Sequence, residues 1–353
     1  ELLTAPWADT KTAITAGATN GTIADIISVD GAWLSEFVDM GILTAAEDAG
    51  VDSSLASDTW KVDGTSYVVP VLNFAYPMYV NMDILKEAGV EAIPTTWTEL
   101  RDACKKITAA GKSAFALNLG TTNANGIQNV FMGTGWGSGI SLKDDSGAYK
   151  TKDNAGLAAL AEMFKGLYDD GSLYPGMSTL EESEMTSNFA AGNCAFTVAS
   201  AATMSQFTDI NFEATTIPVK DDYKDQSGIC YASWAVGITE NSENKEEAAK
   251  FVNYLLGGMD GKDGSASAGL AATMSAFPNS TVAEPDYSEA PKQFQSYYEL
   301  YKKNYVINEF IGLPNASDVM TSMTNDLTTY LEGEIDSAKL LSNWQGYLDE
   351  AGK

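Results

Sequence analysis

Short apolar runs alternate with amphipathic segments along the chain. The runs 24–29, 113–119 and 194–199 have the length and composition of buried strands. In the segments 154–168 and 245–256, apolar residues recur at helical spacing, which is typical of helices that bury one face. Strands separated by helices over the whole length predict an α/β fold with largely parallel sheets.

Turn residues and a proline allow more specific predictions for residues 60–81. Asp63-Gly64 lies between two extended segments, so 60–70 is predicted to be a β-hairpin. The next run, 71–81, is apolar but contains Pro77, which has no amide hydrogen to donate to a sheet. We therefore expect 71–81 to be an irregular crossing segment rather than a central strand.

The composition limits the class of protein. A length of 353 residues suggests two lobes, and 44% hydrophobic residues are typical of a globular chain. No apolar run reaches the ~18 residues that a membrane helix needs. A net charge of −27 would repel nucleic acid, so we expect no nucleic-acid partner.

The ionisable residues exclude several chemistries. The chain has no histidine, which removes the usual acid–base group near neutral pH and the commonest metal ligand. Cys104, Cys194 and Cys230 lack the spacing of a zinc site, and we interpret them as buried thiols that could form at most one disulfide. We therefore predict no bound metal and no cofactor.

Five stretches, taken in order, carry a family resemblance. They are residues 25–33 with Phe37 and 41–43, 77–89 with 94–100, 189–196, 234–238 with 244–251, and 333–334, and they include DIISVDGAW, PMYVNMDILKEAG and FAAGNCAF. The ordered set resembles the extracellular solute-binding proteins of ABC importers, specifically their maltose-binding-like, carbohydrate-binding branch. The resemblance covers nearly the whole chain.

The resemblance implies an α/β, two-lobed fold of the periplasmic-binding-protein type, with a hinge and a ligand cleft. We expect 1–74 and 236–277 to form the N-terminal lobe, and 75–235 and 278–353 the C-terminal lobe. The chain would bind a sugar or oligosaccharide, do no chemistry on it, and deliver it to the transmembrane subunits of an ABC permease. Such a protein would be an extracytoplasmic monomer, either lipid-anchored at the cell surface or in the periplasm.

The sequence departs from the family pattern at two places. Family members begin with a strand and a long helix before the strand whose tail Glu1-Leu2-Leu3 resembles. The first βα unit of the N-terminal lobe is therefore expected to be absent from this chain. Several maltodextrin binders also place a stacking Trp where Ala201 and Ala202 stand, so maltodextrin specificity is not carried over.

Sugar recognition requires aromatic rings for the apolar faces of the sugar, and carboxylates or amides for its hydroxyls. Asp30 follows the apolar run 24–29, at a strand end where α/β sheets bind ligands. It could accept a ligand hydroxyl, cap the next helix, or do both. Trp33 could be a stacking platform or a core residue of that helix.

Six candidates lie on the two segments where the resemblance puts crossings between lobes. They are Asn73, Phe74 and Tyr76 on the first segment, and Tyr231, Ser233 and Trp234 on the second. For Phe74 and Tyr76, packing between lobes is the alternative to ligand contact. Asn73 stands among apolar residues, so its amide needs a polar partner.

Three further candidates lie elsewhere in the sequence. Asn118 stands at the end of the run 113–119, before a loop of Gly, Thr and Asn. Trp136 stands among glycines, which suggests an exposed ring that a ligand could approach closely. Asn315 precedes a late helix, and a helix cap is the alternative to ligand contact.

Two other functions remain as alternatives. A glycoside hydrolase would need two carboxylates flanking the scissile bond, and Asp30 has no acidic partner among the other candidate residues. A carbohydrate-binding surface protein without a transport role would share the same binding residues. We therefore expect a binding protein without a catalytic residue, and product analysis on bound sugars separates it from a hydrolase.

Overall fold

The computed structural model describes residues 7–223, 230–258, 260–301 and 308–352. The chain forms two compact units. Unit 1 consists of Glu1–Phe74, Ala232–Ala290 and Phe310–Ala316, and unit 2 consists of Ala75–Tyr231, Pro291–Glu309 and Ser317–Lys353. The chain therefore passes from one unit to the other five times. The expected strand tail at Glu1-Leu2-Leu3 lies outside the described residues.

These units differ from the expected lobes in their later segments. Residues 278–290 and 310–316 pack with unit 1, whereas we expected 278–353 to belong to the C-terminal lobe. Residues 232–235 also pack with unit 1 rather than with the second lobe. These units are defined by packing alone, so the expected division into functional lobes stays a prediction.

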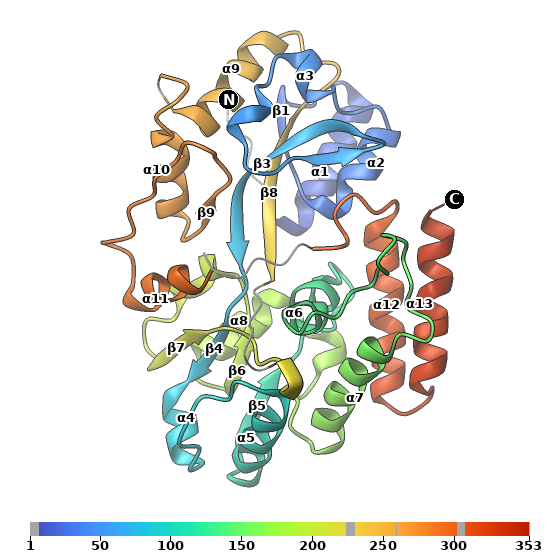
Figure 1. Ribbon diagram of the computed structural model, residues 1–353, viewed down its shortest axis with the longest axis vertical. Coiled ribbons are helices and arrows are strands. Elements are labelled where there is room, and N and C mark those ends of the chain that lie inside the picture. Colours follow the sequence, from blue (N-terminus) through green and yellow to red (C-terminus); the bar gives the residue numbers. More distant parts are fainter. Residues whose placement is uncertain (1–6, 224–229, 259, 302–307, 353) are drawn as a thin grey trace. The chain divides into compact units, whose positions relative to one another are not determined.

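Unit 1 is built on a sheet with the strand order β1–β8–β3–β2, and β9 pairs with β3. The strands are β1 (Ile26–Val29), β2 (Trp60–Val62), β3 (Thr65–Ala75), β8 (Tyr231–Ile238) and β9 (Phe277–Pro278). Figure 1 shows the long strands β3 and β8 side by side. Asp63 and Gly64 both have positive φ between β2 and β3, which confirms the predicted hairpin.

The helices of unit 1 precede β2 or follow β8 along the chain. They are α1 (Trp7–Asn20), η1 (Gly31–Trp33), α2 (Leu34–Asp39), α3 (Ala46–Ala49), η2 (Ser53–Leu55), α9 (Lys245–Gly257) and α10 (Ser265–Thr273). The segment 310–316 packs against η1, where the amide of Gly312 donates to the carbonyl of Gly31 at 3.2 Å. A Cβ on Gly31 would lie 2.7 Å from Cγ1 of Ile311, so this contact requires glycine.

Unit 2 is built on a second sheet with the order β5–β6–β4–β7. Its strands are β4 (Met78–Asn81), β5 (Ser113–Ala116), β6 (Cys194–Val198) and β7 (Phe212–Thr215). Its helices are α4 (Met82–Glu87), α5 (Trp97–Ala109), the π-helix η3 (Ile127–Met132), α6 (Gly133–Gly137), α7 (Ala155–Asp169), η4 (Met177–Thr179), α8 (Glu182–Ala190), η5 (Ala201–Gln206), η6 (Asp221–Tyr223), α11 (Lys292–Tyr301), α12 (Ala316–Leu331) and α13 (Ser337–Ala351). Figure 1 shows α12 and α13 running beside each other, and Tyr347 of α13 donates to Asp326 of α12 at 2.9 Å.

Two predictions about the strands are wrong. The sheets are not largely parallel, since β1–β8, β2–β3, β3–β9, β4–β6 and β4–β7 all pair antiparallel, while β5 and β6 pair in parallel. Nor is 71–81 an irregular crossing, because it contains the end of β3 and all of β4, each flanked by strands on both sides. Pro77 falls in the two-residue break between these strands, where the sheets need no amide donor.

Buried aromatic and sulfur-containing side chains fill unit 2. The ring of Tyr79 lies 4.8 Å from that of Phe207 and 5.9 Å from that of Phe212, in the edge-to-face geometry that aromatic pairs prefer. Cys104, Cys194 and Cys230 are all buried free thiols, as predicted. In the described part of the chain, no helix is long and apolar enough for a membrane span.

Candidate functional site

Five of the predicted site residues meet at one end of the unit 1 sheet. Asn73 and Phe74 end β3, Ser233 and Trp234 lie near the start of the neighbouring β8, and Asp30 follows β1. The register of β1 and β8 pairs Val29 with Ala235, so Asp30 comes next to Trp234 along the same direction. We call these five residues, Asp30, Asn73, Phe74, Ser233 and Trp234, the sheet-end cluster.

Asp30 combines a capping role with an electrostatic cost. Its carboxylate accepts a hydrogen bond from the amide of Ala32 at 2.9 Å. Asp30 therefore caps η1, which is one of the two roles predicted for it. Burial raises the pKa of Asp30 from 3.8 to about 6, and the Ala32 amide and the charge of Lys11 offset this only in part. A neutral asparagine would cap equally well, so the cap alone does not explain a carboxylate here.

The other members of the cluster provide an amide and an indole. Ser233 Oγ donates to Asn73 Oδ1 at 2.6 Å, so the buried amide has the polar partner that the sequence predicted. The rings of Phe74 and Trp234 lie 6.5 Å apart in an edge-to-face arrangement. Phe74 is buried, whereas Trp234 is 37% exposed, one of few large apolar side chains exposed in the described chain. Such a ring is available for stacking on a sugar.

Trp33 lies three residues after Asp30 in the sequence, and Asn315 belongs to the segment 310–316, which packs against η1. Trp33 is buried in η1, and its ring lies 6.1 Å from that of Phe37. It therefore occupies the core position that was the alternative to a stacking platform. Asn315 precedes α12 in the segment 310–316, is exposed, and has a positive φ of 50°. Its role as a ligand contact stays a prediction.

Four predicted residues belong to unit 2. The amide of Tyr76 donates to the carbonyl of Cys230 at 2.9 Å, which places Tyr76 beside the segment that leads into Tyr231. The side chains of Tyr76 and Tyr231 are both buried. Asn118 is also buried, at 2% exposure, and its Nδ2 donates to Oδ1 of Asn125 at 3.0 Å.

Trp136 is not the exposed aromatic that its glycine neighbours suggested. The glycines belong to the short helix α6, where Gly135 packs closely on Leu160, and Trp136 is only 5% exposed. Its indole Nε1 donates to Oε2 of Glu309 at 2.6 Å. Glycine here serves close helix packing rather than ligand access, so the prediction of an exposed ring is wrong.

Glu309 is a residue that sequence reasoning missed. Besides Trp136, its carboxylate accepts hydrogen bonds from Ser141 Oγ and from the amide of Leu142, at 2.8 Å for the latter. Tyr149 Oη donates to the backbone carbonyl of Glu309 at 2.6 Å. Glu309 is more than 150 residues away from all of these partners in the sequence, so no local signal could have revealed it.

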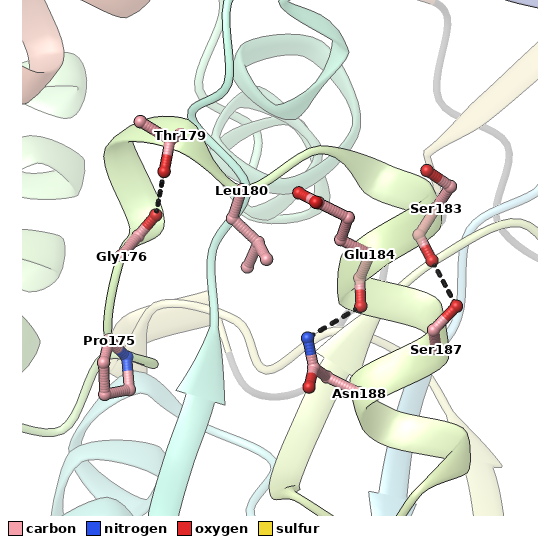
Figure 2. A pocket seen from close by; sticks show the side chains of 8 residues that line it. All are labelled: Pro175, Gly176, Thr179, Leu180, Ser183, Glu184, Ser187 and Asn188. Atoms are coloured by element: carbon pink, nitrogen blue, oxygen red, sulfur yellow. Dashed lines mark hydrogen bonds between the residues drawn. The ribbon is translucent and has the colours of Figure 1, made fainter.

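Unit 2 also carries a surface hollow. It is lined by residues of the segment before α8 and of α8 itself, among them Thr179, Ser187 and Asn188 (Figure 2). These three side chains donate to the carbonyls of Gly176, Ser183 and Glu184 of their own segments. Because their donors already bond to nearby backbone, the hollow does not offer the convergent polar groups that a ligand site needs. In the described residues, no group of three or more Cys, Asp or Glu side chains is placed to hold a metal ion.

Sequence comparison relates the chain to known binding proteins. The family model of the bacterial extracellular solute-binding proteins matches residues 1–257. A Brucella abortus protein named as a binding protein is 24% identical over 274 residues, which are 71% of this chain and 62% of that protein. The sn-glycerol-3-phosphate-binding periplasmic protein UgpB of Brucella melitensis is 25% identical over 303 residues, 80% of this chain and 66% of UgpB. The chain thus spans less than two thirds of the length of the first of these relatives.

Among solved structures, maltose-bound MalE3 of T. maritima has the same fold. It superposes with a TM-score of 0.77 over 99% of this chain and 90% of MalE3, at 20% sequence identity. The chain therefore has the two-lobed fold of the periplasmic binding proteins, as predicted. It belongs to the family of bacterial extracellular solute-binding proteins, which confirms the predicted class and its extracytoplasmic location.

Proposed function

We propose that this protein is the substrate-binding component of an ABC importer and that it binds a neutral sugar or oligosaccharide. The observation that carries the proposal is the sheet-end cluster, which combines an exposed indole, a bonded amide–hydroxyl pair and the costly carboxylate of Asp30. These are the groups that sugar binding needs. The ligand would be passed unchanged to the transmembrane subunits of a permease.

Charge favours a neutral ligand over a phosphate. Relatives include proteins named for binding sn-glycerol 3-phosphate, and phosphate recognition commonly uses arginine. The single arginine of this sequence, Arg101, is bonded to Asp170 through Nε at 2.6 Å. Lys11, whose charge acts on Asp30, forms an ion pair with Glu36 at 2.6 Å. A phosphate beside Asp30 would also meet a negative charge.

We also propose that the protein acts without chemistry on its ligand, as a monomer, and that it is held at the cell surface by a lipid anchor or moves freely in the periplasm. Asp30 has no carboxylate beside it in the sheet-end cluster to complete the pair that a glycosidase uses. The support for a permease partner is the family membership together with a Deinococcus radiodurans relative, 25% identical over 258 residues, that is named as an ABC transporter-binding protein.

The first experiment measures the shift in melting temperature with glucose, maltose, maltotriose, cellobiose, xylobiose and sn-glycerol 3-phosphate. A ligand that binds only the folded protein stabilises it by RT ln(1 + [L]/Kd), so a neutral sugar should raise the melting temperature by an amount that grows with the logarithm of its affinity. Stabilisation by sn-glycerol 3-phosphate alone would overturn the neutral-sugar proposal. Chromatography of the incubated sugars should show no smaller products.

The second experiment tests the sheet-end cluster. Trp234→Ala should weaken the Kd of the sugar that binds at least tenfold, because it removes the stacking surface. Phe251→Ala is the matched control, since Phe251 is 50% exposed on α9, outside the cluster. Equal affinities of the two variants would show that the cluster does not bind the ligand.

A further inference from the structure

The loop that follows β5 is held in a strained form by two neighbouring carboxylates. Ala124 has a positive φ of 49°, which costs a non-glycine residue energy and persists where the surroundings impose it. Glu181 Oε1 accepts from the amide of Thr122 at 3.1 Å. A Cβ on Gly120 would lie 2.3 Å from the same Glu181 oxygen, so only glycine leaves room for this carboxylate. The loop 120–126 is thus fixed from α8.

Glu182, the next residue, begins a directional chain of hydrogen bonds. Its carboxylate accepts from Nδ2 of Asn125, so the amide of Asn125 must present its oxygen on the other side. That oxygen accepts from Nδ2 of Asn118 at 3.0 Å. The orientation of both amides is therefore set by the acceptor at the start of the chain.

The chain ends in an unused acceptor. Oδ1 of Asn118 is buried and has no hydrogen-bond partner among the described residues. A buried acceptor without a partner destabilises the folded chain, so a donor that reaches it gains more than it would at an exposed oxygen. Sugar hydroxyls are such donors. Two exposed residues of the same loop, Thr121 and Thr122, lie within four positions of Asn118.

We propose that Glu182 is a positioning residue for sugar binding: through Asn125, its charge state decides whether Asn118 presents its carbonyl oxygen or its NH₂ group to a ligand. An ionised Glu182 only accepts, which leaves the oxygen of Asn118 free for a hydroxyl. A protonated Glu182 can donate to Asn125, which reverses both amides and turns the NH₂ of Asn118 outward. The inference rests on the proposed function in that the ligand is a sugar that reaches Asn118.

The surroundings place this switch in the physiological range. Burial raises the pKa of Glu182 from 4.5 to about 7, opposed by the hydrogen bonds from the Ser200 amide and from Asn125. From β4, the hydroxyl of Tyr79 donates to the Ser200 carbonyl at 3.0 Å, and burial above all, with the Glu182 charge adding, raises the pKa of Tyr79 so that it stays neutral. Glu181 and Glu184 are the charged neighbours on α8. Binding through the oxygen of Asn118 should therefore weaken as pH falls through about 7.

The first test follows the side-chain amide signals of Asn118 and Asn125 by NMR between pH 5.5 and 8.5 without any ligand. In the unmodified protein these signals should titrate with a midpoint near 7. In Glu182→Gln, which keeps an amide oxygen for Asn125 but does not ionise, they should be flat. Glu213→Gln, at an exposed position of β7, is the matched control and should titrate as the unmodified protein does. Amide signals that ignore pH in all three proteins would overturn the inference.

The second test measures Kd by calorimetry at pH 6 and pH 8 with the sugar of the panel that gives the largest thermal shift. The ratio of the Kd of Glu182→Gln to that of the unmodified protein should change at least threefold between the two pH values, while the ratio for Glu213→Gln stays constant. Asp30 is present in every protein compared, so its own titration cancels from these ratios. A constant ratio for Glu182→Gln would refute the role in binding. If no sugar of the panel binds, the proposed function fails, whereas the NMR result still decides whether Glu182 sets the amides.

Discussion

At the scale of single residues, each of the two units holds a carboxylate that the fold makes costly. Asp30 and Glu182 both have a raised pKa, to about 6 and about 7, and burial is the main cause for each. A folded protein gains nothing from burying an ionised group that a neutral residue could replace. Retaining such groups is typical of sites selected for function rather than stability.

This argument predicts a gain in stability when Asp30 is made neutral. The pKa of Asp30 is higher in the folded chain than its ordinary 3.8, so its contribution to stability is fully present below about pH 3.8 and is lost as pH rises through about 6. Asp30→Asn keeps the cap and removes this electrostatic cost. The gain in free energy of unfolding over the unmodified protein should therefore be larger at pH 7.5 than at pH 4, by up to about 3 kcal/mol. Urea denaturation at both pH values measures the difference.

The matched control for this change is Asp39→Asn, at an exposed position near the end of α2. It should leave the pH dependence of unfolding as it is in the unmodified protein. If Asp30→Asn behaves like Asp39→Asn, Asp30 carries no electrostatic cost, and the main support for its role in binding disappears.

At the scale of elements, Glu309 ties α6 and the segment 141–149 to the end of the stretch 291–309. Three donors, the indole of Trp136, the hydroxyl of Ser141 and the amide of Leu142, converge on its carboxylate. The indole and the Leu142 amide bond to Oε2, and the Ser141 hydroxyl bonds to Oε1. Hydrogen bonds to a carboxylate are stronger than those to a neutral amide, so the carboxylate holds these segments more tightly than a glutamine would.

We accordingly predict that Glu309→Gln lowers the free energy of unfolding by about 2 kcal/mol, the range for losing hydrogen bonds to a charged group. Glu332→Gln, at an exposed position just after α12, should change it by less than about 0.5 kcal/mol. Urea denaturation followed by tryptophan fluorescence measures both. Equal stability of the two variants would mean that the three donors find other acceptors.

The elements also show what the sequence can and cannot predict. Local signals were sufficient for the Asp63-Gly64 hairpin and for the strands β1, β5 and β6, because turn chemistry and apolar runs act between neighbours. Strand direction was not predictable in this way: β8 pairs antiparallel with β1, and the direction of a strand depends on the path of the whole chain between the two strands, which no local signal records. Likewise, the glycines around Trp136 are compatible with close helix packing and with ligand access. Only the position of Leu160, which packs against Gly135, distinguishes these two interpretations.

The candidate site was predictable in its parts but not in its connections. Asp30, Asn73 and Trp234 could be chosen from the sequence because each is unusual among its neighbours. Glu182 and Glu309 could not, since an acidic residue among 48 acidic residues carries no signal until its partners are known. Those partners lie 57 or more residues away along the chain.

At the scale of the whole molecule, the charge of −27 acts on every part of the chain at once. Self-repulsion destabilises a compact state, and salt screens it, with a Debye length of about 10 Å at 0.1 M. The melting temperature should therefore rise by several degrees between 10 mM and 300 mM sodium chloride. Glycine betaine at the same osmolality, which carries no net charge, should not reproduce the full increase. A fall in melting temperature with salt would show that attractive ion pairs outweigh the repulsion.

The order in which strands occur in unit 1 also governs how the protein is made. The sheet has β8 between β1 and β3, yet β3 ends at Ala75 and β8 begins only at Tyr231. At a synthesis rate of about 5–20 residues per second, the 156 positions from 75 to 231 take roughly 8–30 s. For that time the ribosome carries a chain whose first sheet cannot close. A nascent chain whose sheet is incomplete for so long stays unfolded in that region. An unfolded chain is the form that can pass through a translocation channel.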